Sequence, residues 1–188
     1  AVILVGAPLW GIVGLFITFT PEFAKDFGMT EIPKAGTAVL ACYAGLFVGD
    51  AFSGILSQLL RSRRKAVAIC LVFMSISIAA YVLAPHETLF EYYSLCFMMG
   101  VSAGYWAMFV QMGAEQFGTN IRATAATSIP NMVRGFIIPM SGAFHFLIPY
   151  TGVTMAGVTV LAVMISLAFA SLLVLRETFH EDLDYVEI

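Results

Sequence analysis

Long stretches without charged residues constrain this 188-residue chain more than any other feature of its sequence. Five stretches carry at most one charge each: residues 1–20, 35–60, 66–85, 92–114 and 123–175. The two charges are Asp50 in the second stretch and Arg134 in the fifth. A helix needs about 20 apolar residues to cross the hydrocarbon core of a bilayer. Four stretches are therefore long enough for one crossing, and the fifth is long enough for two.

The sequence predicts an all-α, polytopic membrane protein with six transmembrane helices that form one domain over residues 1–188. Pro149-Tyr150-Thr151-Gly152 divides the longest stretch where a turn is needed. The predicted helices cover residues 1–20, 35–60, 66–84, 91–113, 124–147 and 153–175. Because the connections are short, neighbouring helices are expected to run antiparallel in one bundle. An acidic tail follows over residues 176–188.

Composition excludes several classes of protein. A soluble domain has about 25% charged residues, whereas this chain has 11%, with 60% hydrophobic residues and a mean hydropathy of +0.92. The net charge is −3 and no stretch is basic enough to bind a phosphate backbone, so no nucleic-acid partner is expected. Cys42, Cys70 and Cys96 stand singly in apolar runs, which argues against disulfides and metal ligands. No catalytic or cofactor-binding motif is present, so we expect neither an enzyme nor a cofactor.

The distribution of basic residues predicts the orientation. One side of the predicted bundle carries six of them: Arg61, Arg63, Arg64, Lys65, Arg122 and Arg176. The opposite side carries only Lys25 and Lys34, offset by neighbouring acids. Because cytoplasmic loops carry the excess of lysine and arginine, the first side and both ends of the chain are expected in the cytoplasm. The expected location is the plasma membrane, or the inner membrane of a bacterium.

The predicted helix over residues 124–147 carries a polar stripe. Its members recur at steps of three, four or seven and therefore share one helical face: Thr124, Thr127, Asn131, Arg134, Ser141 and His145. In a membrane such a face is turned toward protein or toward a water-filled cavity, not toward lipid. Pro130 and Pro139 each remove a backbone donor and are expected to bend this helix.

Asp50 and Arg134 are the two charges within the predicted hydrocarbon layer, at similar depth. An isolated charge there costs several kcal/mol, so both are expected to have partners. The hypothesis is that they pair with each other or line one aqueous cavity. Such a pair either serves the structure alone or breaks and reforms during transport.

Two further patterns allow a structural and a functional interpretation. Gly45 with Gly49, and Gly100 with Gly104, form two GxxxG motifs, which favour close helix packing. The alternative is a smooth wall along which helices slide or a solute passes. The aromatic residues Trp10, Tyr43, Tyr105 and Trp106 either line a pocket or serve as packing and interface anchors.

Residues 115–125 read E-Q-F-G-T-N-I-R-A-T-A, which resembles the E-x-F-P-T-x-x-R-A-T-A motif of the major facilitator superfamily, with Gly118 at the place of the proline. Residues 54–65 resemble the family's G-x-L-S-D-R-x-G-R-R loop, with Gln58 at the place of the aspartate. Arg176-Glu177-Thr178, followed by Asp182-Leu183, is similar to the P-E-T-x-x-x-x-L tail of its sugar and metabolite porters.

This resemblance implies the carboxyl-terminal half of a twelve-helix secondary transporter, in which the amino-terminal half is the partner. The expected function is alternating-access transport of a small polar metabolite, coupled to an ion such as the proton. Candidates for the cavity lining are Trp10, Tyr43, Trp106, Asn131, Arg134 and Ser141. Candidates for coupling or gating are Asp50, Arg134, Arg61, Arg63, Arg64 and Arg122. The alternatives are a channel-like subunit and a membrane subunit that transports nothing.

Overall fold

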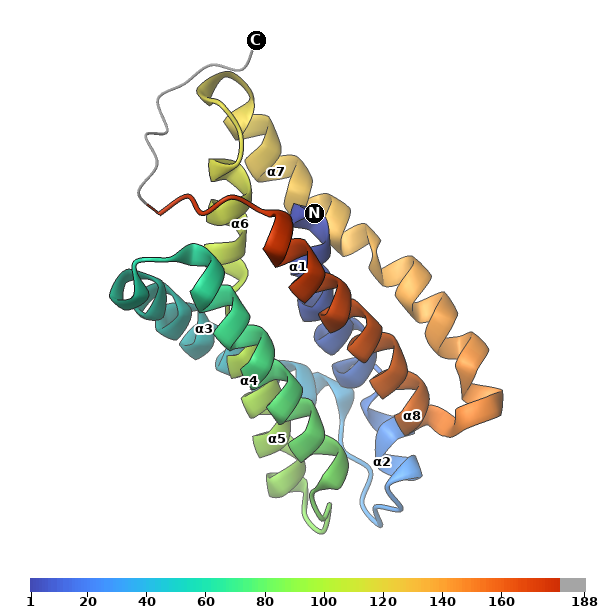
Figure 1. Cartoon of the computed structure of the whole chain (residues 1–188). Coiled ribbons are helices and arrows are strands. Elements are labelled where there is room, and N and C mark those ends of the chain that lie inside the picture. Colours follow the sequence, from blue (N-terminus) through green and yellow to red (C-terminus); the bar gives the residue numbers. More distant parts are fainter. Residues whose placement is uncertain (180–188) are drawn as a thin grey trace.

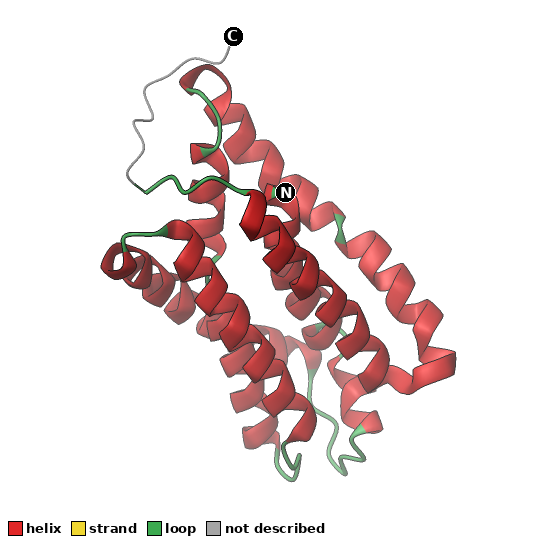
Figure 2. Ribbon diagram, in the orientation of Figure 1, coloured by secondary structure: helices red, strands yellow, loops and turns green. Residues whose placement is uncertain are grey.

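A computed structural model describes residues 1–179, and every regular element in that part of the chain is a helix (Figures 1 and 2), which confirms the predicted all-α class. The elements in chain order are α1 (Val2–Gly11), the π-helix η1 (Ile12–Ile17), α2 (Thr20–Asp26), α3 (Ala35–Leu60), α4 (Arg63–Leu83), α5 (Leu89–Ala103), α6 (Trp106–Glu115), α7 (Thr119–Gly135) and α8 (Ile137–Val174). Residues 180–188 of the predicted acidic tail, including Asp182 and Leu183, lie outside the described residues.

Four helical stretches in the described chain are long and apolar enough to cross a membrane, or five if a bent pair at the start counts as one span. This count of four or five spans is below the six separate spans that the sequence predicts. The difference arises because residues 119–174 count as one stretch of 56 residues. Within it, Gly152 has non-helical dihedral angles (φ 81°, ψ 170°), and Figure 1 shows the chain reversing direction there.

The first predicted helix does not end at residue 20. It continues as α2 to Asp26, after a bend of 67° between η1 and α2. Pro21 accounts for the interruption, because it cannot donate to the carbonyl of Ile17 and its ring would clash with that carbonyl in a continuous helix. The Thr20 hydroxyl donates to the same carbonyl oxygen over 2.8 Å, so this buried acceptor remains satisfied.

The fourth predicted helix is also interrupted. Residues 91–113 belong to α5 and α6, which are separated at Gly104 and Tyr105. Helix α5 begins earlier, at Leu89, because Thr88 and Glu91 form a reciprocal capping box. Tyr105 is fully buried, and its hydroxyl donates to the carbonyl oxygen of Val5 over 3.0 Å. The break is therefore held in place by the first helix.

The two GxxxG motifs face each other across α3 and α5. A Cβ atom added at Gly49 would lie 2.2 Å from the carbonyl oxygen of Val101, and one added at Gly100 would lie 2.0 Å from that of Cys42. Additions at Gly45 and Gly104 would also meet backbone atoms, at 2.1 and 2.4 Å. The close helix packing predicted from these motifs is confirmed, because only glycine allows backbones to approach this far.

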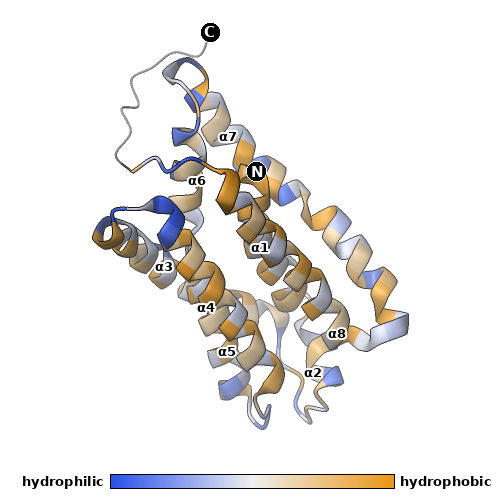
Figure 3. Ribbon diagram, in the orientation of Figure 1, coloured by the Kyte–Doolittle hydropathy of each residue, from blue (hydrophilic) through white to orange (hydrophobic). Residues whose placement is uncertain are grey.

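The most buried part of the chain is α1 with η1, where the side chains of Val5, Ile12, Leu15 and Phe16 are fully buried. Other helices expose large apolar residues along their length, for example Phe47 of α3, which is 78% exposed. Figure 3 shows hydrophobic residues along most helices, whereas α7 carries hydrophilic residues along its length. Exposed apolar surface on this scale is typical of a protein that lies in a lipid bilayer.

Candidate functional site

Four of the six predicted lining residues lie around one cavity of about 120 Å³. They are Trp10 of α1, Tyr43 of α3, Trp106 of α6 and Arg134 of α7, which come from distant parts of the chain. The remaining lining residues are apolar: Leu9, Val13 and Leu46. The cavity thus combines one cation with aromatic and aliphatic walls. We refer to it as the Arg134 cavity.

The guanidinium group of Arg134 lies over two indole rings. Its central carbon is 5.5 Å from the ring centroid of Trp10 and 5.7 Å from that of Trp106. The two rings meet edge to face, with centroids 5.9 Å apart and an interplanar angle of 81°. Asn131 accepts a hydrogen bond from Nη1 of Arg134 over 3.1 Å. Each cation–π contact contributes about 0.5–2 kcal/mol, so the side chain is held in position without a carboxylate.

The predicted pairing of Asp50 with Arg134 is wrong. Oδ1 of Asp50 accepts a hydrogen bond from the backbone N–H of Ala107 over 3.1 Å, in the first turn of α6. A carboxylate is favoured at that position because the N-terminus of a helix carries partial positive charge. Arg134 forms no ion pair with any acid in residues 1–179, and Asp50 does not line the Arg134 cavity.

The polar stripe of α7 is largely exposed. Thr124, Thr127, Asn131 and Arg134 are exposed, and Asn131 donates through Nδ2 to the carbonyl oxygen of Thr127 over 3.0 Å. Beyond Arg134 the stripe is interrupted at Phe136, where α7 ends and α8 begins. Pro139 explains this break because the carbonyl of Gly135 loses its helical donor.

Ser141 and His145 therefore belong to a different helix from Arg134. Ser141 does not line the Arg134 cavity, so its predicted place among the lining residues is not confirmed. His145 lies edge-on against Phe19, with ring centroids 5.3 Å apart. Helix α7 continues through Pro130, and the interruption of the helix at Phe136 lies three residues before Pro139.

A second polar cluster, missed by the sequence analysis, surrounds a buried ion pair between α4 and α6. Nη2 of Arg63 lies 3.3 Å from Oε1 of Glu115, and the two side chains are only 10% and 8% exposed. Glu115 also accepts hydrogen bonds from Gln111 over 2.9 Å and from Thr178 over 2.6 Å. Nη1 of Arg63 donates to the Ser57 hydroxyl of α3 over 3.0 Å. The ion pair therefore joins three helices and the segment after α8.

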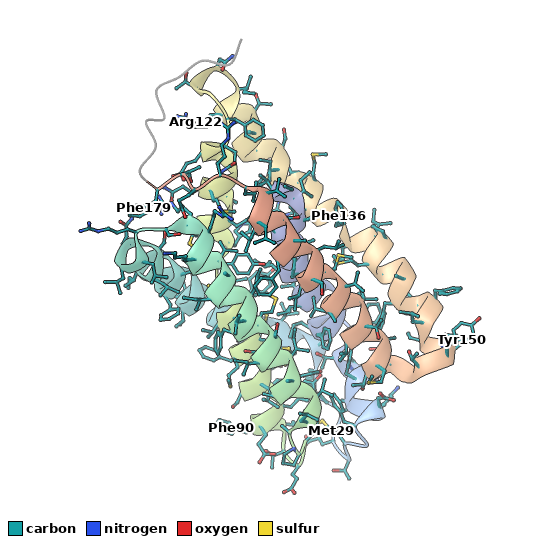
Figure 4. The ribbon with its side chains drawn as sticks, viewed as in Figure 1. Met29, Phe90, Arg122, Phe136, Tyr150 and Phe179 are labelled. Atoms are coloured by element: carbon teal, nitrogen blue, oxygen red, sulfur yellow. The ribbon has the colours of Figure 1, made fainter. Side chains whose placement is uncertain are left out.

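Residues 176–179, here called the C-terminal strap, attach to the start of α4. The Glu177 carboxylate accepts from the backbone N–H groups of Arg63 and Arg64 over 2.9 and 3.3 Å, and from the hydroxyl of Ser62. The Phe179 ring lies 5.2 Å from the guanidinium carbon of Arg63, and Figure 4 shows it beside this end of α4. The strap thus satisfies helix donors that would otherwise lack partners.

The other predicted gating residues are not part of this buried cluster. Arg61 and Arg64 line an open groove with Lys65 and Glu177, and Arg61 has a left-handed backbone conformation (φ 47°). Nε of Arg122 donates to the carbonyl oxygen of Phe117 over 3.2 Å. Among the predicted basic residues, Arg63 is the one for which residues 1–179 provide a buried ion-pair partner, Glu115.

The strap is expected to detach in acid. Partial burial opposes ionisation of Glu177, but hydrogen bonds from Ser62 and from the backbone of Arg63, Arg64 and Phe179 outweigh it and lower the pKa of Glu177 below its ordinary value of 4.5. Its stabilising contribution is therefore complete above pH 4.5 and is lost as the pH falls through the lowered pKa. The protection of the amides of Arg63 and Arg64 against hydrogen exchange, relative to the intrinsic rate at each pH, should fall in that range. Glu177→Gln should lower this protection already at neutral pH, and unchanged protection in both cases would refute the assignment.

The described chain is thus a helical bundle with segments long and apolar enough to cross a membrane, and with a cavity lined by one arginine that has no ion pair in residues 1–179. Comparison with protein-family models, with curated proteins and with solved structures found no match to this chain.

Proposed function

We propose that the chain is the carboxyl-terminal half of a secondary active transporter of the major facilitator type. It moves a small polar metabolite by alternating access, coupled to an ion such as the proton. The observation that carries this proposal is the Arg134 cavity. It gathers residues from the first, second, fourth and fifth predicted helices and none from the third or sixth. In the resembling family, those four helices border the solute path.

The exposed polar stripe of α7 supports the same proposal. A row of hydroxyl, amide and guanidinium groups inside a bilayer cannot face lipid without a large solvation cost. Asn131 and Arg134 remain exposed in the structure of residues 1–179. The proposal places water and a second half-bundle on this face, with the solute between the two halves.

The proposed topology counts six crossings. The reversal at Gly152 divides residues 119–174 into two crossings, and the bent pair α1–η1 and α2 makes one. With an even number of crossings both ends lie on one side, which the basic residues assign to the cytoplasm. The buried pair of Arg63 and Glu115, with the strap, then lies at the cytoplasmic ends of the helices, where a gate would operate.

Reconstitution of the complete protein in lipid vesicles tests the transport function. Labelled metabolites are screened with and without a proton gradient, and we expect saturable uptake and counterflow for one class of solute. Arg134→Ala should reduce this uptake at least about tenfold, because one lost charged hydrogen bond weakens binding by that factor. Lys25→Ala removes an exposed cation on α2 that does not line the cavity, and should leave uptake unchanged.

Two results would reject the proposal. Flux that never saturates and shows no counterflow would indicate a channel-like subunit instead. Normal uptake by Arg134→Ala, with the variant inserted at the same level, would remove Arg134 from the solute path.

A further inference from the structure

We infer that the Arg134 cavity recognises the carboxylate group of a small monoanionic solute with a flat, apolar body. This inference rests on the proposed transport function and specifies its substrate class. Three independent features of the cavity support it: an uncompensated charge, an unused set of hydrogen-bond donors, and walls that are otherwise apolar.

The charge of Arg134 has no counter-ion among residues 1–179. The nearest candidate by depth, Asp50, is engaged by the backbone N–H of Ala107, and Arg134 pairs with no other acid in residues 1–179. A lone cation in a hydrocarbon layer is costly, and intramembrane charges of this kind mark substrate paths. A bound anion would provide the missing compensation. Because the cavity holds a single cation, it suits one negative charge and not two.

The donors of Arg134 fit a carboxylate. A guanidinium group has five N–H donors, and within the described part of the chain the side chain of Arg134 makes one hydrogen bond, to Asn131. The contacts with Trp10 and Trp106 use the faces of the rings and leave the other N–H groups of Arg134 available. Two parallel hydrogen bonds from one guanidinium to one carboxylate form the strongest and most directional pairing available to it.

The indole N–H of Trp10 is a second unused donor. Its nitrogen is buried and has no hydrogen-bond partner in the described chain. Buried polar groups are rarely left unsatisfied, and such an exception in a binding cavity points to a missing acceptor. Trp10 lies against Arg134 and lines the same cavity, so a donor without an acceptor adjoins the guanidinium group.

The other residues that line the cavity restrict the size and polarity of the part of the solute beyond its carboxylate. Leu9, Val13 and Leu46 provide aliphatic surface, and the two indoles and Tyr43 provide flat aromatic surface. Together they enclose only about 120 Å³. Such a cavity favours a solute whose small body packs against the aromatic rings. A long or highly hydroxylated solute is disfavoured.

The two tryptophans of this chain, Trp10 and Trp106, both line the cavity, so their fluorescence reports on binding. The complete protein is purified in detergent and titrated with benzoate and its neutral isostere benzamide, and with acetate and acetamide. We expect benzoate to quench the signal assigned to these tryptophans and to bind about 10- to 100-fold more tightly than benzamide. Acetate should bind more weakly than benzoate.

Arg134→Gln should abolish the preference for benzoate over benzamide. Arg134→Lys retains the charge but not the planar set of donors, and should weaken benzoate binding about tenfold. If the first variant fails to fold, the second provides the same test. Trp10→Phe keeps an aromatic ring but removes the indole N–H group. This variant should weaken the binding of benzoate more than that of benzamide.

Equal affinity for benzoate and benzamide, or benzoate binding of undiminished affinity in both Arg134 variants, would overturn the inference. So would the absence of benzoate binding, the result expected if an acid elsewhere in the protein neutralises Arg134. In that case saturable uptake of another solute would leave the proposed transport function intact. Benzoate binding without any uptake would instead support the site and reject transport.

Discussion

Glu115→Gln is expected to destabilise the protein by about 3–5 kcal/mol, because it leaves the buried Arg63 without a counter-ion. The two side chains are 8% and 10% exposed, so water cannot easily solvate the remaining charge. The glutamine also weakens the acceptor on which Thr178 and Gln111 depend. Unfolding of the purified protein, followed by circular dichroism during heating or denaturant addition, measures the loss.

A double variant distinguishes the effect of an unpaired buried charge from the effect of lost packing contacts. Arg63→Met combined with Glu115→Gln removes both charges, and replacement of a whole buried pair costs far less than removal of one member. The double variant should therefore be more stable than Glu115→Gln alone. A double variant that is less stable than either single variant would show that the two charges do not compensate each other.

Gly49→Ala should separate α3 from α5 and lower stability by about 1–3 kcal/mol. The new methyl carbon would lie 2.2 Å from the carbonyl oxygen of Val101 and 2.8 Å from Cα of Gly104. Both are backbone atoms, so no side chain can rotate away to make room. Because Gly104 also begins the break between α5 and α6, the shift should reach the position of Trp106.

Gly54→Ala is the matched control, since it lies on the same helix and an added Cβ meets nothing within 4 Å. Alanine is the better helix former by up to about 1 kcal/mol, so this variant should be at least as stable as the natural protein. Equal melting temperatures for the two variants would contradict the proposed role of the glycine contacts.

Hydropathy predicted the helices well where no backbone break occurs. Residues 35–60 are helical as predicted, and the helix predicted from residue 66 begins three residues earlier, at Arg63. Its charged first turn could not be recognised by a search for uncharged stretches, although Ser62 is a recognisable N-cap. The bend at Pro21 and the interruption at Gly104 were missed because hydropathy measures the length of an apolar stretch and not its backbone geometry.

Part of the candidate site could be predicted from residue types. The sequence analysis selected a cation within a predicted span, where exposure to lipid is costly, and three aromatic residues. These four residues meet in one cavity: Trp10, Tyr43, Trp106 and Arg134. Asp50 was assigned the wrong partner because helical depth does not specify which way a side chain turns around the helix axis. Ser141 was misplaced because the stripe was extended through a break that Pro139 could have indicated.

The ion pair of Arg63 and Glu115 could not be found by spacing. The two residues lie 52 positions apart, and each looks like an ordinary charge at a helix end. Only the packing of α4, α6 and the strap buries them together. A signal was nevertheless present, since both residues lie in the two motifs that resemble conserved cytoplasmic loops of the transporter family.

The accessibility of α7 to water tests the central claim most directly. Asn131→Cys in the complete protein, in vesicles, is treated with a charged thiol reagent that does not enter lipid. Ile76→Cys on α4 is the control, because Ile76 is an exposed apolar residue on a surface assigned to lipid. Background labelling of the native cysteines in this chain should be low, because Cys42, Cys70 and Cys96 are buried. We predict rapid labelling at position 131 and little at position 76; equally slow labelling at both would contradict an aqueous path beside Arg134.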